Sequence, residues 1–337
     1  MVTSTRTRYF LVGAGLILVV GLGTGLVAYY AGELPLGGMR HRTGDLAYVP
    51  SDASIVAYAD VRAVMHSEFR QHLRQVIPDG SEQQQFQNET GIDIERDVDS
   101  VTAVLGSTTG GNGDGTLVLV RGALNPLQIE TYLVQHGAVA EDYLGKRLLK
   151  NSPQAGSDKG GGCVAFLDPG LVALGSEAAI KRAIDGAGGS VNSNAEMTRL
   201  IGEVDGHGDT VWAVGRLDKI PNAAAVPGAV KDQLAAVQWF AVSGHVDGGI
   251  NGVVRLEARD DQAAENLRAI VNGGLALAHL QMGKDSKIDG VINSLQLTGT
   301  GKDVQLAFSV PAEVLDVVNG IAGLANLQGV GKKMIPK

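Results

Sequence analysis

Cysteine is nearly absent from this chain of 337 residues, in which Cys163 is the only one. A single cysteine cannot form an internal disulfide, and it offers no thiol cluster for a metal or a redox pair. Aromatic residues are also scarce, at 4% of the chain. Basic residues do not dominate, because 36 Asp and Glu outnumber 28 Lys and Arg. The net charge of −8 argues against nucleic acid as a partner, since its recognition depends on a basic surface.

Charge is also absent from one long stretch, residues 10–30, which read FLVGAGLILVVGLGTGLVAYY. An apolar run of about 20 residues has the length of a helix that spans a bilayer. Arg6 and Arg8 precede the run, and Tyr29 and Tyr30 close it, where aromatic rings favour the membrane interface. We therefore expect residues 10–30 to be an uncleaved transmembrane anchor. A cleaved secretory signal is the alternative, but its apolar core is usually about 7–15 residues long.

The basic residues that flank this run predict an orientation. Arg6 and Arg8 lie close to it on the amino-terminal side, whereas Arg40 and Arg42 lie farther away on the other side. The positive-inside rule then places the amino terminus in the cytoplasm. The expected location is the cytoplasmic membrane, with a single pass and an extracytoplasmic bulk that is periplasmic if the source is a double-membrane bacterium. The expected partners are the membrane, through residues 10–30, and another envelope protein.

Small residues line one face of the expected anchor: Ala14, Gly21, Gly25 and Ala28. Gly21 and Gly25 form a GxxxG pair, which lets two membrane helices approach closely and would allow a homodimer through the anchor. The alternative is that Gly is simply common in membrane helices. We favour this second interpretation, because the pattern is short.

The predicted domain organisation follows from the positions of apolar runs and helix breakers. It comprises a cytoplasmic tail (1–9), the anchor (10–30), a linker rich in Gly and Pro (31–45), a first repeat domain (46–190), a second repeat domain (191–325) and a carboxy-terminal tail (326–337).

The two halves of the globular part show the same order of periodic segments. Each predicts a β-α-ββ-α-ββ-α unit, with helices expected at 62–76, 126–136, 177–185, 222–236, 262–280 and 311–321. The fold class is α+β, because hairpin-joined strands form antiparallel sheets that helices can cover on one face. We expect the two sheets to pack on each other, since strands such as 55–61 are apolar on both faces.

Several short matches support an internal duplication. Ser54–Ala57 (SIVA) aligns with Thr210–Ala213 (TVWA), and in the following strands Ala103 aligns with Ala241. The same alignment of those strands matches Gly106 with Gly244, Gly110-Gly111 with Gly248-Gly249, and Arg121 with Arg259. We predict that these glycines occupy equivalent backbone positions with positive φ, which Gly adopts without steric cost.

Two segments resemble a known group of bacterial sequences. Residues 46–70, LAYVPSDASIVAYADVRAVMHSEFR, and residues 171–185, LVALGSEAAIKRAID, are similar to uncharacterised N-terminally anchored proteins of the DUF3352-like group. The similarity covers most of residues 46–190, and its motifs are strand and helix-cap patterns. The resemblance implies an extracytoplasmic location and no known activity, so it identifies no catalytic residue.

Weak metal candidates occur in two turn-like stretches of the second half. His207 lies two residues from Asp209, and His245 lies two residues from Asp247. Imidazole and carboxylate ligands would suit zinc if the four side chains converged. The alternative is a pair of solvated turns, in which Asp and Gly are favoured for backbone reasons. We favour the turns and predict no catalytic residue, no metal and no cofactor.

Three functions remain open. The favoured one is a membrane-anchored extracytoplasmic scaffold or binding module, which is not an enzyme. The alternatives are a metal-dependent hydrolase that uses the His/Asp turns, and a carrier of an apolar ligand. Convergence of the four His and Asp side chains in one pocket would favour the hydrolase. A continuous apolar cavity would favour the carrier.

Overall fold

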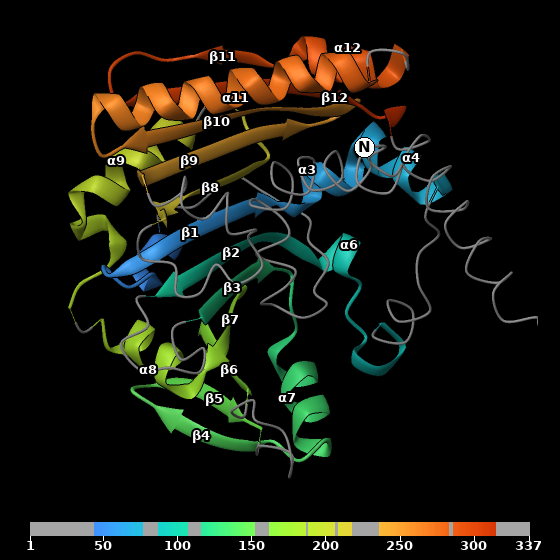
Figure 1. Ribbon diagram of the computed structural model, residues 1–337. Helices are drawn as coiled ribbons and strands as arrows, with labels where there is room; N and C mark the ends of the chain where they lie inside the picture. The colour runs from blue at the N-terminus through green and yellow to red at the C-terminus, as the bar shows by residue number, and fades with distance from the viewer. Residues whose placement is uncertain are drawn as a thin grey trace, which may run out of the picture.

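The computed structural model describes residues 44–76, 87–106, 116–151, 162–186, 188–205, 208–217, 236–282 and 286–314. These residues form one antiparallel sheet of 12 strands in the order β11-β12-β10-β9-β8-β1-β2-β3-β7-β6-β5-β4. Figure 1 shows the strands following one another from β11 at the top to β4 at the bottom.

The bounds of the elements are as follows. The strands are β1 (Ala53–Asp60), β2 (Val98–Gly106), β3 (Thr116–Gly122), β4 (Val139–Tyr143), β5 (Lys146–Lys150), β6 (Gly162–Asp168), β7 (Leu171–Ser176), β8 (Val211–Arg216), β9 (Val237–Val246), β10 (Gly249–Ala258), β11 (Gln296–Thr298) and β12 (Asp303–Pro311). The helices are η2 (Asp45–Tyr48), α3 (Val61–His66), α4 (Glu68–Val76), α6 (Ile94–Asp97), α7 (Pro126–Gln135), α8 (Glu177–Asp185), η3 (Val191–Ser193), α9 (Ala195–Val204), α11 (Asp261–Met282) and α12 (Ser286–Ser294).

The centre of the sheet is the pair β1 and β8, one strand from each half of the chain. They pair antiparallel, with Ala57 opposite Ala213 and Tyr58 opposite Trp212. The rings of Tyr58 and Trp212 stack at a centroid distance of 5.6 Å. The sheet continues through β2, β3 and β7 on one side and through β9, β10 and β12 on the other. The two halves therefore share one sheet.

This arrangement contradicts the predicted fold class of two repeat units whose sheets pack on each other. The chain forms a single mixed structure of helices around one large sheet. Two packed sheets were predicted because some strands are apolar on both faces, but helices on both sides of a single sheet produce the same pattern. Ile55 and Val56 point to opposite faces and are both buried, because β1 lies in the middle of a sheet that is covered on both sides.

The predicted alignment of the second strands is wrong by one residue. Ala57 pairs with Ala103 in the first half, but Ala213 pairs with Val242 in the second. A shift of one residue moves a side chain to the other face of a sheet. Accordingly, Ala241 packs in the core beneath α8 and α9, whereas Ala103 packs in the core on the opposite face.

Helices cover both faces. On the first, called the α8 face, the largest core joins β1, β3, β6, β7 and β8 to α8 and α9, with Ile180 and Met197 among its fully buried side chains. On the second, called the α7 face, smaller cores lie beneath α3 and α6, beneath α11 and beneath α12. Burial of one large apolar side chain contributes about 1.5–3 kcal/mol to stability. Because the core of the α8 face contains the most buried side chains, it contributes most to the stability of the fold.

Local sequence signals predicted several elements well. Helix α8 has the predicted bounds, and Ser176 caps it by accepting a hydrogen bond from the Ala179 amide at 3.1 Å. The predicted helix 62–76 is divided at Ser67 into α3 and α4. Strands β4 and β5 form a hairpin, whose turn residues Leu144 and Gly145 both have positive φ.

Other elements were missed or mispredicted. Helices α9 and α12 were not predicted, and residues 311–314 belong mainly to the end of β12 and a turn rather than to a helix. The helix expected at 222–236 lies outside the described residues except for Ala236, and so does most of 311–321. Gly110 and Gly111 also lie outside them.

The prediction that the aligned glycines have positive φ is wrong for those within the described residues. Gly106, Gly244, Gly248 and Gly249 are not among the described glycines with positive φ. Strand packing accounts for nearby Gly252 instead, because a Cβ there would lie 2.6 Å from the Phe308 ring and 2.7 Å from the Ser243 carbonyl oxygen.

The membrane assignment is corrected as well. Within the described ranges, no helix is long and apolar enough to cross a membrane. The predicted span 10–30, with Ala14, Gly21, Gly25 and Ala28, lies outside those ranges. The described residues therefore do not support a single-pass membrane location.

The two edges of the sheet differ in length and charge. β11 has only three residues. β4 carries Glu141 and Asp142, and Glu141 forms ion pairs with Lys150 of β5 and Lys181 of α8. Glu177 of α8 also pairs with both lysines, so the four charges join the edge hairpin to the helix.

A buried ion pair anchors the start of the described chain to the sheet. The Nε of Arg121 on β3 donates to both carboxylate oxygens of Asp45, at 2.8 and 3.1 Å, and its Nη2 donates as well. These hydrogen bonds raise the pKa of Arg121. The Asp45 side chain is only 4% exposed, so Arg121 rather than water compensates its negative charge. Arg259, aligned with Arg121 in the sequence, is exposed.

This contrast predicts unequal effects for two Arg→Ala substitutions. Arg121→Ala should lower the free energy of unfolding by about 3 kcal/mol, because it leaves a buried carboxylate without its counter-charge. Arg259→Ala, the matched control, should change it by less than about 0.5 kcal/mol, as is usual for surface substitutions. Urea unfolding of both variants measures the difference, and equal losses would contradict the structural assignment.

Candidate functional site

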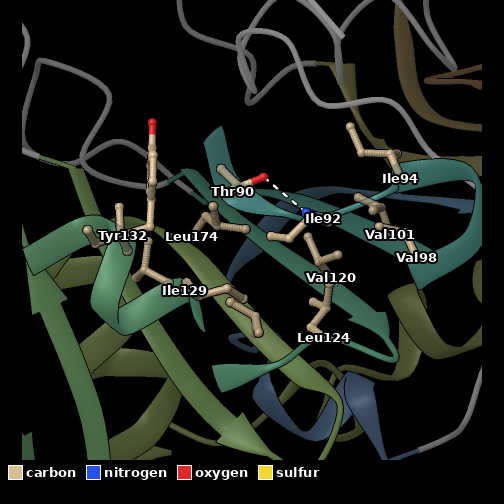
Figure 2. A pocket seen from close by; sticks show the side chains of 13 residues that line it. Thr90, Ile92, Ile94, Val98, Val101, Val120, Leu124, Ile129, Tyr132 and Leu174 are labelled. Carbon is tan, nitrogen blue, oxygen red and sulfur yellow. Dashed lines mark hydrogen bonds between the residues drawn. The ribbon is translucent and has the colours of Figure 1, made fainter. Parts of the chain in front are cut away.

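The main candidate site is an apolar cavity on the α7 face, shown in Figure 2. Its volume is about 150 Å³. Its floor is formed by side chains of β2, β3, β6 and β7, and its walls by α7 and by the segment that leads into α6. Thirteen residues line it: Thr90, Ile92, Ile94, Val98, Val101, Val120, Leu124, Ile129, Tyr132, Leu133, Val164, Val172 and Leu174.

The chemistry of the lining is almost wholly that of hydrocarbon. Thr90 and Tyr132 are the lining residues, among those described, that carry a polar side-chain group. The Thr90 hydroxyl oxygen accepts a hydrogen bond from the Ile92 amide at 3.2 Å, so it serves the local turn. A space of this size with apolar walls is large enough for a compact apolar molecule, as an engineered cavity of about 150 Å³ holds benzene.

Helix α7 forms one wall and is packed loosely. Asn125 caps its first turn by accepting from the amides of Leu127 and Gln128, and Pro126 occupies its first position. None of its residues is fully buried, and Leu127 is 73% exposed. Ile129 points from the helix toward the cavity in Figure 2. The helix contacts the sheet through its lining side chains and through the ion pair of Glu130 with Arg147 of β5, at 2.7 Å.

A close contact joins α7 to the opposite wall. The side chain of Gln128 lies against Gly91, where a Cβ would be 1.8 Å from the Gln128 Nε2 atom. Gly91 also has a positive φ of 70°. The positive φ favours glycine here, whereas the Gln128 contact could be relieved by movement of that exposed, flexible side chain.

Polar groups gather at the rim of the cavity. The hydroxyl of Tyr132 points away from the other lining side chains in Figure 2 and donates a hydrogen bond to Glu89 Oε2 at 3.2 Å. The Tyr132 ring also lies against His136, with centroids 4.2 Å apart. Desolvation raises the pKa of Tyr132, and the neighbouring Glu89 carboxylate adds to the rise. The phenol therefore stays protonated and continues to donate.

The predicted metal candidates lie elsewhere. His207 is outside the described residues. The Nδ1 of His245, on β9, lies 3.0 Å from the Gly208 carbonyl oxygen, and Asp247 belongs to the β9–β10 turn. Asp209 lines a separate hollow on the α8 face. Across the described ranges, no group of three or more His, Cys, Asp or Glu residues is arranged to hold a metal ion.

The hollow that contains Asp209 is polar and charged. It lies between α9 and the strands β9, β10 and β12, and its volume is about 720 Å³. An ion pair between Arg255 and Glu203, at 2.6 Å, lines it, and Arg199 contacts Glu203 from the same helix. Each of these charges already has a partner of opposite sign, which is the arrangement of a solvated protein surface.

The sequence prediction missed the apolar cavity. Its walls come from segments that are distant in the chain, and each lining residue has the pattern of an ordinary core position. A signal was nonetheless present in α7, where PLQIETYLVQ places Leu127, Ile129, Leu133 and Val134 on different sides of the helix. A helix in a single core would concentrate such residues on one side.

Cys163 is buried in β6 and belongs to the core of the α8 face. Burial raises the pKa of its thiol to about 11, and the nearby Glu177 carboxylate acts in the same direction. Since the thiolate is the reactive form, the side chain behaves as a small apolar core residue.

Ellman's reagent should therefore fail to modify Cys163 in the folded protein at pH 8. The expected reason is twofold: the thiol is enclosed, and well under 1% of it is ionised three pH units below its pKa. One equivalent should react once guanidinium unfolds the chain, and a Cys163→Ala variant gives the background. Rapid reaction of the folded protein would instead indicate an accessible nucleophile.

Comparison with known proteins adds no relative to this description. No family model, no curated protein and no solved structure matches the chain. The resemblance of residues 46–70 and 171–185 to the DUF3352-like group therefore stays a prediction, and the site must be interpreted from its own geometry.

Proposed function

We propose that this protein is a binding module that holds a compact apolar ligand in the cavity beneath α7. The observation that carries the proposal is the cavity itself, with about 150 Å³ of apolar space between β2, β3 and α7. Small-molecule sites in proteins are concave, mostly apolar and few in number, which is the character of this cavity. Of the three functions left open by the sequence, an apolar cavity favours the carrier.

The energetics agree with this role. An empty cavity lowers stability, by roughly 24 cal/mol for each Å³ in one well-studied series. An apolar molecule that fills the space restores dispersion contacts and removes its own surface from water, at about 0.8 kcal/mol for each buried CH₂ group. Displacement of α7 offers a route of entry, because none of its residues is fully buried, and it would require the Glu130–Arg147 ion pair to open.

Benzene is a suitable first probe, since it matches the cavity in size and lacks polar groups. At a concentration nine times its Kd, benzene should stabilise the folded protein by about 1.4 kcal/mol. The expected rise in Tm is about 2 °C for a protein of this size, and it should saturate with concentration. Absence of a saturable shift would contradict the proposal.

Two substitutions on α7 provide a matched test. Leu133→Trp should abolish the benzene effect by filling the cavity, whereas Leu127→Trp makes the same change at an exposed position and should leave it intact. Overpacking at Leu133 can cost about 1–3 kcal/mol, so the milder Leu133→Phe is included. Circular dichroism verifies that each variant is folded. Equal benzene effects in all variants would place the binding elsewhere.

A further inference from the structure

The polar hollow on the α8 face has a floor of short side chains. Ser243 of β9 lies opposite Val253 of β10, and the next pair on the same face is Ala241 opposite Arg255. Side chains directly opposite each other share one face of a sheet. Because Ala241, Ser243 and Val253 are short, they leave a space of about 720 Å³ beside α9. This volume lies within the range of roughly 300–1,000 Å³ that is common for small-molecule sites.

Longer polar side chains surround this floor. Gln305 of β12 lies opposite Arg255 at one end of the hollow, and Asn251 of β10 lies at the other end. Glu203 of α9 and Asp209, which precedes β8, also line it. These residues come from separate elements, so the strand register and the position of α9 set the spacing of the polar groups.

The hydrogen-bonding capacity of these groups is only partly used. The amide oxygen of Asn251 accepts from the Ser309 hydroxyl at 2.5 Å, which leaves the amide nitrogen to donate elsewhere. Within the parts of the chain that the structure describes, the side chains of Asp209, Ser243 and Gln305 have no hydrogen-bond or ion-pair partner. The hollow therefore presents an amide, a hydroxyl and a carboxylate, which together donate and accept hydrogen bonds.

The charges of the hollow disfavour an anionic ligand. Arg255 is the cation among its described lining residues, and its Nη1 donates to Glu203 Oε2 at 2.6 Å. Asp209 adds a second carboxylate to the lining. An anion would therefore meet two carboxylates and a guanidinium that is already paired. A neutral ligand avoids this repulsion and still has polar groups to contact.

We infer that this hollow is a second binding site, which takes a neutral ligand rich in hydroxyl groups, such as a mono- or disaccharide. Each hydroxyl both donates and accepts, so neighbouring hydroxyls of a sugar can pair with the Asp209 carboxylate or the Gln305 amide. They replace bound water without loss of its hydrogen bonds. The methyl groups of Ala241 and Val253 give the C–H face of the ring an apolar surface. This inference does not depend on the apolar cavity.

Four neutral sugars and two anionic ones test the ligand class on the full-length protein. The neutral probes are glucose, galactose, maltose and cellobiose, and the anionic probes are glucuronate and galacturonate. At least one neutral sugar should bind saturably, and both uronates should bind at least about five times more weakly than the best neutral sugar, as expected of one partly exposed charge. Ligand-observed saturation-transfer NMR measures the titrations.

Two substitutions test the location of the site. Gln305→Ala should weaken binding of the best sugar about fivefold, and Asp209→Ala about tenfold or more, because a charged acceptor forms the stronger hydrogen bonds. Gln262→Ala is the matched control, since Gln262 is exposed on α11 of the α7 face, and it should leave the affinity unchanged. Circular dichroism verifies that each variant is folded.

Each result supports or overturns the inference. Saturable binding of a neutral sugar that both variants weaken supports it. Absence of saturable binding for every probe overturns it, and so does tighter binding of a uronate than of any neutral sugar. Binding that neither variant weakens would place the sugar elsewhere and overturn the site. Leu133→Trp should leave sugar binding unchanged, because Leu133 lines the cavity on the opposite face, so the two binding proposals can fail separately.

Discussion

The pairing of β1 with β8 is the interaction on which the rest of the structure depends. These strands come from different halves of the chain, and their ladder, centred on Ala57 and Ala213, makes the two sets of strands one sheet. Stacking of Tyr58 on Trp212 fixes the same register from the α8 face. Each flanking strand is added outward from this pair, so an error in its register would displace the cores on both faces.

The sequence predicted local elements better than their assembly. Periodicity and caps located α7 and α8, because these signals lie within about ten residues. The alignment of Ser54–Ala57 with Thr210–Ala213 identified the two central strands, and Ala57 does face Ala213. No sequence pattern within either strand indicates that the two strands pair with each other, and for this reason two separate sheets were predicted. The one-residue error between Ala103 and Ala241 has a similar cause, since Val and Ala alternate weakly in both strands.

The candidate site was even harder to predict from the sequence than the assembly of the strands. Short sequence motifs point to residues with distinctive chemistry, such as His245 and Asp247. Among the described residues, neither belongs to a group that could hold a metal ion. The cavity is instead built from valine, leucine and isoleucine, whose individual positions look like those of any core. Its existence depends on the distance between α7 and the sheet, to which contacts between separate segments contribute, such as the ion pair of Glu130 on α7 with Arg147 on β5. Such a distance has no signature in a single sequence.

The charged edge strand β4 has a consequence for the behaviour of the protein in solution. A large sheet with an open edge can add strands from other molecules, which is a common start of aggregation. Here the edge strand carries the charged side chains Glu141 and Asp142, which a second copy would have to desolvate in order to pair with it, and Asp142 also forms an ion pair with Arg147. The ion pairs of Glu141 with Lys150 and Lys181 also hold the edge hairpin against α8. High salt screens such charges, so the protection against edge-to-edge growth is strongest at low ionic strength.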